Sequence, residues 1–169
     1  MLYLLDANVL ITAHNLYYPV DAVPEFWEWL AHQGEVGNLK MPTETFEEVK
    51  DGGRKVETDL LYAWVRDTAN KAAILLEDEV VPQLVQEVTA RYAPDLRDDE
   101  LDAIGRDPFL IAHALADPAN RCVVTTEVSK RTTRRQNRRI PDVCEDMNVR
   151  CVDTFSMLKA LNFTTRWQN

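Results

Sequence analysis

The sequence predicts an α/β fold, a three-layer α/β/α sandwich around a central, mostly parallel sheet. Short apolar runs at residues 2–5, 121–125 and 149–152 are typical of strands buried inside a sheet. Segments with helical spacing separate these runs, and this alternation favours helical crossovers between parallel strands. A chain of 169 residues can bury one core, and no linker or repeat divides it. We therefore expect a single domain over residues 1–169.

The first elements follow from short local signals. The opening strand stops at Asp6, and a helix is expected over residues 9–17. A second helix over 21–33 has Pro24 near its start, where the missing N–H is tolerated. A turn follows, and then residues 38–42 form a short extended piece that ends at a proline.

The next helix begins at Thr43 and has an acidic first turn, which the positive end of a helix dipole stabilises. The acids near its start are Glu44, Glu47 and Glu48. Residues 51–53 (DGG) break this helix, and another is expected over 58–68. The segment 71–76 fits either a strand or a helix.

The second half of the chain repeats the pattern. An amphipathic segment over 79–92 and a charged loop over 94–100 precede the clearest helix of the chain, over 108–116. That helix is apolar at almost every position, so we expect it to be buried against the sheet. Shorter helices over 141–147 and 154–161 flank the last strand.

Composition restricts the function classes. No apolar stretch approaches the roughly 18 residues of a membrane helix, and the N-terminus lacks the basic region of a signal peptide. Three cysteines (Cys122, Cys144 and Cys151) without a C-x-x-C pair are typical of reduced, mostly buried thiols. Cys144 and Cys151 could meet in space. We expect a cytoplasmic protein with no membrane partner.

The charge of the chain is unevenly distributed. The net charge is −9, but residues 130–139 carry +6 with no acid, so the rest of the chain carries −15. The basic residues are Lys130, Arg131, Arg134, Arg135, Arg138 and Arg139. On a helix they would cover about half of the circumference without any acid at i+4 to compensate them. A solvated charged helix is one interpretation, and contact with a nucleic-acid backbone or an acidic partner protein is the other. We favour nucleic acid.

Acidic residues stand at the positions where an α/β sheet places a ligand site. Asp6 ends the opening strand, and Glu127 comes just past the strand at 121–125, so both lie at carboxyl ends of strands. Asp107 begins the buried helix, and Glu48 belongs to the helix that Thr43 opens. Acids gathered at one sheet end repel one another unless a cation such as Mg²⁺ or Mn²⁺ compensates them. Such a site can activate water and neutralise charge as a phosphodiester is cleaved.

Most of these residues also have a purely structural interpretation. Aspartate before proline at a helix start is a good N-cap, yet one oxygen of Asp107 can cap while the other binds metal. Asn8 is either a helix cap or an assisting ligand. Thr125, rather than Thr126, is expected to orient water or a ligand through its hydroxyl group. His113 lies in an apolar helix and is expected to be a hydrogen-bonded core residue.

Taken in order, these motifs resemble those of PIN-domain nucleases. Residues 5–11 (LDANVLI) are similar to the opening motif of that family, and 107–114 (DPFLIAHA) to its third acidic motif. Residues 123–127 (VVTTE) resemble the strand-Thr-x-acid motif that closes the site, and Glu48 in 45–49 matches the acidic helix position between them. The resemblance covers residues 2 to about 161.

The resemblance implies metal-dependent cleavage of RNA, as in the toxins of bacterial toxin–antitoxin pairs. The implied ligands of Mg²⁺ or Mn²⁺ are Asp6, Glu48, Asp107 and Glu127. Asn8 and Thr125 would assist them, and the basic residues of 130–139 would position the RNA strand. The implied partners are an RNA substrate, an antitoxin protein and a second copy of the chain in a homodimer.

Some features remain open or depart from the family. Spacing alone does not choose among Glu44, Glu47 and Glu48, because all three lie close together on one helix. The last acid is Glu127 where aspartate is usual, and the segment 130–139 is longer and more basic than in a minimal member. These departures point to an atypical subgroup.

Two other functions fit parts of the pattern. A haloacid-dehalogenase-like phosphatase would use Asp6 as its nucleophile, but that family has a second aspartate where this chain has Asn8. A catalytically silent PIN-like module would bind RNA or a protein through the segment 130–139, and the change to Glu127 is compatible with it.

Overall fold

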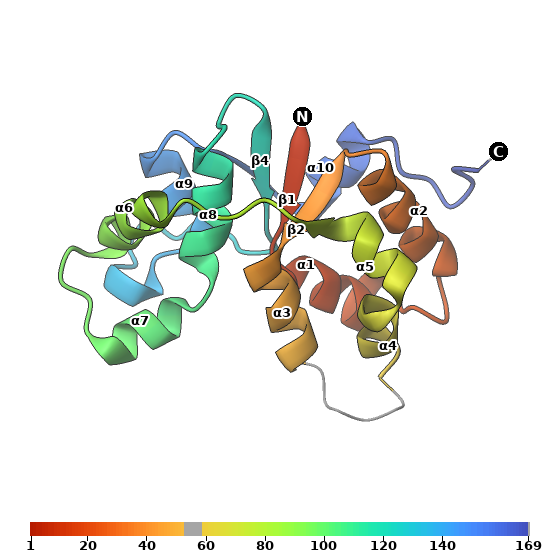
Figure 1. The fold of residues 1–169 in the computed structure, drawn as a ribbon, viewed down its shortest axis with the longest axis horizontal. Helices are drawn as coiled ribbons and strands as arrows, with labels where there is room; N and C mark the ends of the chain where they lie inside the picture. The colour runs from red at the N-terminus through yellow and green to blue at the C-terminus, as the bar shows by residue number, and fades with distance from the viewer. Residues whose placement is uncertain (53–58, 169) are drawn as a thin grey trace.

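Five parallel strands form the centre of the structure, in the order β3-β2-β1-β4-β5 (Figure 1). They are β1 (Leu2–Leu5), β2 (Leu39–Pro42), β3 (Leu75–Leu76), β4 (Arg121–Val124) and β5 (Arg150–Val152). The structure is a computed structural model that describes residues 1–52 and 59–168. Helices flank the sheet on both faces, which confirms the predicted three-layer α/β/α sandwich with a parallel sheet.

Helices connect successive strands. Those of the first half are α1 (Ala7–Thr12), the π-helix η1 (Ala13–Tyr17), α2 (Pro24–Glu35), α3 (Thr43–Gly52), α4 (Leu60–Arg66) and α5 (Thr68–Ile74). Those of the second half are α6 (Pro82–Tyr92), α7 (Asp98–Ile104), α8 (Asp107–Leu115), the 3₁₀-helix η2 (Arg135–Asn137), α9 (Ile140–Asp146) and α10 (Thr154–Ala160).

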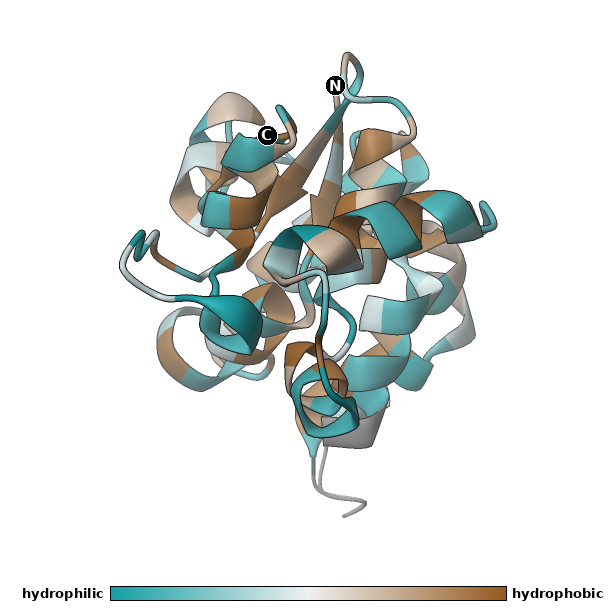
Figure 2. Ribbon diagram, turned by 90° about the vertical axis from the view of Figure 1, so that its left-hand side faces the viewer, coloured by the Kyte–Doolittle hydropathy of each residue, from teal (hydrophilic) through white to brown (hydrophobic). Residues whose placement is uncertain are grey.

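The sheet separates two hydrophobic cores because successive side chains of a strand point to opposite faces. Leu5 and Val124 belong to the core under α1, α2, α4, α5 and α10. Leu4 and Val123 belong to the core under α6, α7, α8 and α9. Figure 1 shows these two groups of helices on either side of the strands, and Figure 2 shows that the strands between them are largely hydrophobic. As predicted, the apolar helix α8 is buried against the sheet.

Some element boundaries had been left open by the sequence, and others were wrong for reasons outside the local pattern. The segment 71–76, for which strand and helix were both open, is helical through Ile74 and then contributes the two residues of β3. The helix expected over 58–68 ends at Arg66, and Asp67 caps α5 by accepting from two backbone N–H groups. Residue 58 of that prediction, like residue 53 of the predicted helix break, lies outside the described residues; α3 itself includes Gly52.

Two charged segments also differ from expectation. The predicted loop over 94–100 contains the start of α7, whose first turn is acidic and whose Glu100 accepts from the backbone N–H of Arg97. The segment 130–139 is not a long helix. It consists of turns and η2, and Arg135 has a positive φ of 54° that interrupts any regular helix.

The structure also shows the lengths of the helices and the state of the cysteines. Among the described helices, none is long and apolar enough to cross a membrane. All three cysteines are free thiols, and Cys122 and Cys144 are buried. Cys144 and Cys151 do meet: a hydrogen bond between them, together with burial, raises the pKa of Cys144.

The turn predicted over residues 34–37 starts later than expected, because α2 continues through Gly34 to Glu35. Gly34 lies where α2 packs against α5. A Cβ atom at this position would stand 2.5 Å from the backbone oxygen of Ala73. Glycine is therefore required here by packing rather than by a turn.

We predict that Gly34→Ala lowers the free energy of unfolding by about 1–3 kcal/mol, because the backbone of α5 must move away. In an open helix the same substitution would stabilise the protein by roughly 1 kcal/mol. Urea denaturation measures the difference, with the exposed Glu35→Ala as a control expected to stay within about 0.5 kcal/mol of wild type. Unchanged or increased stability of the Gly34 variant would contradict the close approach of α2 and α5.

Candidate metal centre

The four predicted acids converge at the carboxyl edge of the sheet. Asp6 directly follows β1, and its backbone N–H donates to the carbonyl oxygen of Val124 in the neighbouring strand β4 (2.9 Å). Glu127 lies just beyond β4, Asp107 opens α8 and Glu48 belongs to α3. The negative charges of Glu48 and Glu127 help to raise the pKa of Asp6. The same two charges and that of Asp6 help to raise the pKa of Asp107. The fold therefore brings together residues separated by up to 121 positions.

Asp6 is the most enclosed of these acids, with an exposed fraction of 3%. Burial raises its pKa to about 6, although a hydrogen bond from the Thr125 hydroxyl group opposes the shift. Thr125 Oγ1 donates to Asp6 Oδ2 (2.8 Å) and accepts from the backbone N–H of Glu127 (3.1 Å). Because its acceptor and donor roles are both used, Thr125 holds one oxygen of Asp6 in a fixed position.

Asn8 and Asp107 occupy different helix positions from those expected. Asp6, not Asn8, is the N-cap residue of α1, and Asn8 is an exposed residue of its first turn. Asp107 is the first residue of α8, and Arg106 occupies the N-cap position. The capping role predicted for Asp107 was therefore wrong, and the cap was not the correct one of the two roles left open for Asn8. The differences are one and two positions, which is the usual uncertainty of a helix boundary.

Asp107 has the strongest shift in the cluster. Burial raises its pKa to about 8, assisted by the charges of Asp6, Glu127 and Glu48. The hydroxyl group of Tyr92, from α6, donates to Asp107 Oδ2 (3.3 Å) and opposes this shift. Sequence reasoning missed Tyr92, because nothing in the amphipathic pattern of α6 distinguishes it from other apolar positions.

The structure distinguishes the three glutamates that spacing left open. Glu47 forms an ion pair with Lys50 on the same helix (2.6 Å). Glu44 lies against the buried His113, with 3.4 Å between Glu44 Oε2 and His113 Nε2. The negative charge of Glu48 raises the pKa values of both Asp6 and Asp107, which assigns this glutamate to the cluster. Burial raises the pKa of Glu48, while the positive charge of Arg106 opposes that shift. His113 is a core residue, as predicted.

Glu127 has two roles in the structure. It contributes negative charge to the cluster, and both of its carboxylate oxygens contact the start of α9. Oε1 accepts from the Arg139 guanidinium (2.9 Å), and Oε2 accepts from the backbone N–H of Ile140 (2.8 Å). The glutamate therefore connects the acidic cluster to the end of the basic segment.

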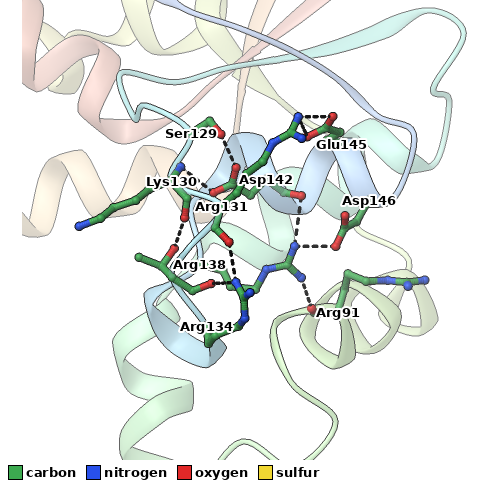
Figure 3. A network of polar contacts seen from close by, with 10 residues as sticks. Arg91, Ser129, Lys130, Arg131, Arg134, Arg138, Asp142, Glu145 and Asp146 are labelled. Atoms are coloured by element: carbon green, nitrogen blue, oxygen red, sulfur yellow. Dashed lines mark hydrogen bonds and ion pairs between the residues drawn. The ribbon is translucent and has the colours of Figure 1, made fainter.

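Helix α9 anchors the basic segment (Figure 3). Asp142 accepts from the hydroxyl group of Ser129 and from the backbone N–H of Lys130. Arg131 donates to both oxygens of Glu145, and Arg138 pairs with Asp146. The segment is thus folded back onto an acidic helix that follows it directly in sequence.

Ion pairs from distant elements neutralise much of the basic segment. Arg135 donates to both oxygens of the buried Glu100 in α7 (2.6 and 2.7 Å) and to Asp95 (2.7 Å). The hydrogen bonds from Arg135, together with one from the backbone N–H of Arg97, hold the pKa of Glu100 near 2. The expectation that acids would not compensate this segment was wrong, because the compensating acids lie elsewhere in the sequence.

Two basic residues differ from the other four. Among the described residues, neither Lys130 nor Arg134 has a carboxylate partner: Arg134 donates to the backbone carbonyls of Arg131 and Thr133. Figure 3 shows the Lys130 side chain extended away from the network. A cavity of about 540 Å³ lies beside Arg134, which lines it together with Tyr92, Arg131 and Arg138 among others. Tyr92, in the lining of this cavity, is also the residue whose hydroxyl group donates to Asp107.

The carboxylate oxygens of the cluster are suitable ligands for a divalent cation. Carboxylate oxygens are the ligands that Mg²⁺ and Mn²⁺ prefer, and a cation would relieve the repulsion that raises the pKa of Asp107. Within residues 1–52 and 59–168, no group of three or more His, Cys, Asp or Glu side chains is arranged to hold a metal ion as the structure stands. Asp6, Asp107 and Glu127 instead contact Thr125, Tyr92 and Arg139.

Fold and site together define an α/β protein with a carboxylate cluster at the carboxyl edge of a parallel sheet. The chain matches the family described as a domain of unknown function (DUF4411) over residues 3–165, and it belongs to that family. No curated protein and no solved structure matches it.

We predict that the metal-free protein loses stability as the pH rises. The pKa values of Asp6 and Asp107 in the folded state are about 6 and 8, above the ordinary value of 3.8. Between pH 4 and pH 8 the folded state keeps protons that the unfolded state has released, so the free energy of unfolding falls as pH increases. We expect a decrease of about 2–4 kcal/mol between pH 5 and pH 8.5 in EDTA.

Urea denaturation across this pH range measures the effect. Asp107→Asn should remove most of the decrease, and the surface substitution Asp21→Asn controls for the loss of one negative charge. If the Asp107 variant kept the full wild-type slope, this carboxyl group would not be the source of the pH dependence.

Proposed function

We propose that this protein is a Mg²⁺- or Mn²⁺-dependent endoribonuclease with a PIN-like fold. One observation carries the proposal. Asp6, Glu48, Asp107 and Glu127 come from four separate elements, and their charges act on one another at the carboxyl edge of the sheet. Keeping several acids together in a partly buried place costs stability in the absence of a cation, which supports a functional rather than a structural reason for their position.

The side chains of the cluster have different roles in this proposal. Thr125 holds one oxygen of Asp6, and the backbone N–H of Asn8 also donates to this carboxylate, so the acid is fixed where a cation would bind. Tyr92 contacts Oδ2 of Asp107 in the same way. A divalent cation bound by the four acids would activate water and neutralise the charge that develops at phosphorus. Asn8, exposed beside Asp6, is placed to contact the substrate.

Lys130 and Arg134 are the best candidates in the basic segment for contacting RNA phosphates. The four paired arginines contribute less, because their charges are already compensated by carboxylates. This proposal keeps the role of the segment 130–139 in positioning RNA but assigns most of it to two residues. Arg131, Arg135, Arg138 and Arg139 then shape the segment.

The resemblance to PIN-domain nucleases supports a biological setting as part of the same proposal. The protein would act as the toxin of a toxin–antitoxin pair, with RNA as its substrate, an antitoxin protein as its inhibitor and a homodimer as its assembly. Its free cysteines suit a reducing compartment such as the cytoplasm.

A second candidate function is a catalytically silent module that binds RNA. The observation that favours it is the position of Glu127, both of whose carboxylate oxygens are engaged by Arg139 and Ile140. If Glu127 keeps these contacts when metal is added, three carboxylates of the cluster (Asp6, Glu48 and Asp107) are left to bind the ion. The basic segment would then be the functional surface.

We predict that the protein binds one or two Mn²⁺ ions, and that Asp6→Asn weakens binding at least tenfold because one central ligand loses its charge. Binding at pH 7 should release close to one proton, since Asp107, with a pKa of about 8, is mostly protonated before it becomes a ligand. Calorimetry in two buffers of different ionisation enthalpy measures both quantities. Equal affinity of wild type and variant would place the metal elsewhere.

We predict that the wild-type protein cleaves single-stranded RNA in Mn²⁺, and that the double variant Asp6→Asn/Asp107→Asn lowers the rate at least 100-fold. Gel electrophoresis of end-labelled RNA measures the rate. Asp117→Asn, in the loop before the amino end of β4, is a matched control that should cleave normally. RNA binding without cleavage in any metal would support the silent module, and full activity of the double variant would contradict the proposed site.

A further inference from the structure

A second cavity opens at the same edge of the sheet, on the opposite face from the basic cavity. It has a volume of about 360 Å³ and lies between α1, η1 and the start of α10. It adjoins the acidic cluster through two residues. Val9 donates its backbone N–H to the carbonyl oxygen of Asp6, and Thr126 stands between Thr125 and Glu127. Whatever occupies this cavity lies next to the candidate metal centre.

Exposed aromatic rings form the mouth of this cavity. Tyr17 of η1 and Phe155 of α10 are both 51% exposed, and their ring centroids lie 5.2 Å apart in an edge-to-face arrangement. Tyr18 provides a fixed neighbour, because it stacks on the core residue Phe26 with centroids 4.5 Å apart. Aromatic rings held at the surface by a rigid core offer faces on which a flat ligand can stack.

The backbone that carries Tyr17 is unusual. Residues of η1 form a π-helix, in which the N–H of Tyr18 donates to the carbonyl oxygen of Ala13 (2.6 Å). π-helical turns are rare and occur mostly at functional sites. Here the wider turn places Tyr17 and Tyr18 side by side in the wall of the cavity.

Polar groups in the lining indicate the chemistry of the occupant. Thr154 is nine-tenths buried, and its hydroxyl oxygen has no hydrogen-bond partner among the described residues. Such unpaired groups are uncommon in native proteins and need an explanation. The neighbouring Asp153, whose carboxylate accepts from Ser156, adds negative charge and further acceptor capacity. The lining therefore disfavours a phosphate group and favours a neutral flat ring with hydrogen-bond donors at its edge.

We propose that this cavity binds one nucleobase of a single-stranded RNA. The base stacks against Tyr17 and Phe155, its polar edge faces Asp153 and Thr154, and the backbone crosses the acids toward Lys130 and Arg134. This inference rests on the proposed function, since the base belongs to the nucleotide beside the phosphate to be cleaved. A duplex is excluded as the direct ligand because its bases are stacked and paired.

The test measures binding and stacking without cleavage. The full chain carrying Asp107→Asn is titrated into ten-nucleotide single-stranded RNAs, each with 2-aminopurine at one position. We expect one position at which the fluorescence of 2-aminopurine is quenched on binding. Adding Tyr17→Leu or Phe155→Leu should remove this quenching and raise Kd about tenfold. Tyr17→Phe, which keeps the ring, should retain both, and the exposed Leu101→Ala in α7 is the surface control.

An RNA with an abasic site at the quenched position gives a check that leaves the protein fold unchanged. Its Kd should rise by the same factor, and Tyr17→Leu should cause no further loss with this RNA. Full additivity of the two changes, or unchanged Kd in the leucine variants, would overturn the nucleobase site and point to a partner protein as the occupant of the cavity.

The outcomes also separate this inference from the proposed nuclease activity. Quenching that depends on Tyr17, in a protein that never cleaves RNA, would support the cavity and overturn the nuclease. Metal-dependent cleavage by the chain with its native Asp107, with a KM that stays unchanged when Tyr17→Leu or Phe155→Leu is introduced into it, would support the nuclease and overturn the cavity. Absence of RNA binding by the wild-type chain would overturn both.

Discussion

The burial of Asp6 at the end of the central strand is the constraint on which the site depends. An enclosed carboxylate is costly to ionise, and three further acids act on the same region, so the metal-free cluster retains protons near neutral pH. The protein offsets part of this cost with one short chain of hydrogen bonds, from the backbone of Glu127 through Thr125 to Asp6. These bonds cross from β4 to β1, so the strand pairing that builds the sheet also fixes the orientation of the acid.

Glu127 couples this cluster to the basic segment. Its carboxylate holds the first residues of α9, and α9 in turn holds the segment through Asp142, Glu145 and Asp146. An aspartate at position 127 has one methylene group fewer, so it would reach less far toward α9. This contact gives a structural reason for the glutamate, which departs from the aspartate expected by resemblance. It also means that a metal ion competing for Glu127 would loosen the start of α9.

Local patterns predicted the fold well because the signals are strong. Apolar runs predicted β1, β4 and β5, whereas β2 was predicted only as a short extended piece and β3 was left open between strand and helix. The parallel sheet then placed Asp6 and the residues after β4 at one edge. Local patterns failed where tertiary contacts decide. The choice of Glu48 depends on partners of Glu44 and Glu47, one of which is His113 from another helix. Likewise, the basic segment was expected to lack compensating acids because its partners lie beyond the i+4 spacing of a helix. Glu145 stands 14 residues after Arg131, and Glu100, which pairs with Arg135, belongs to α7. Tyr92 and the aromatic cavity have no signature in the sequence, because the sequence pattern does not distinguish an exposed aromatic side chain from a buried one.

The two cavities lie on opposite sides of the acidic cluster. The basic cavity is built from the helices on one face of the sheet, and the aromatic cavity from those on the other, with Asp6 at the edge between them. Phosphates bind to cationic surfaces and bases stack on aromatic ones, and in this protein the carboxylates separate a cationic surface from an aromatic one. A strand that satisfies both surfaces must therefore cross the carboxyl edge of the sheet with one phosphate over the acids. In the proposed complex, the stacked base would set the register of the RNA, and Lys130 and Arg134, which have no carboxylate partner among the described residues, would add affinity that is independent of sequence.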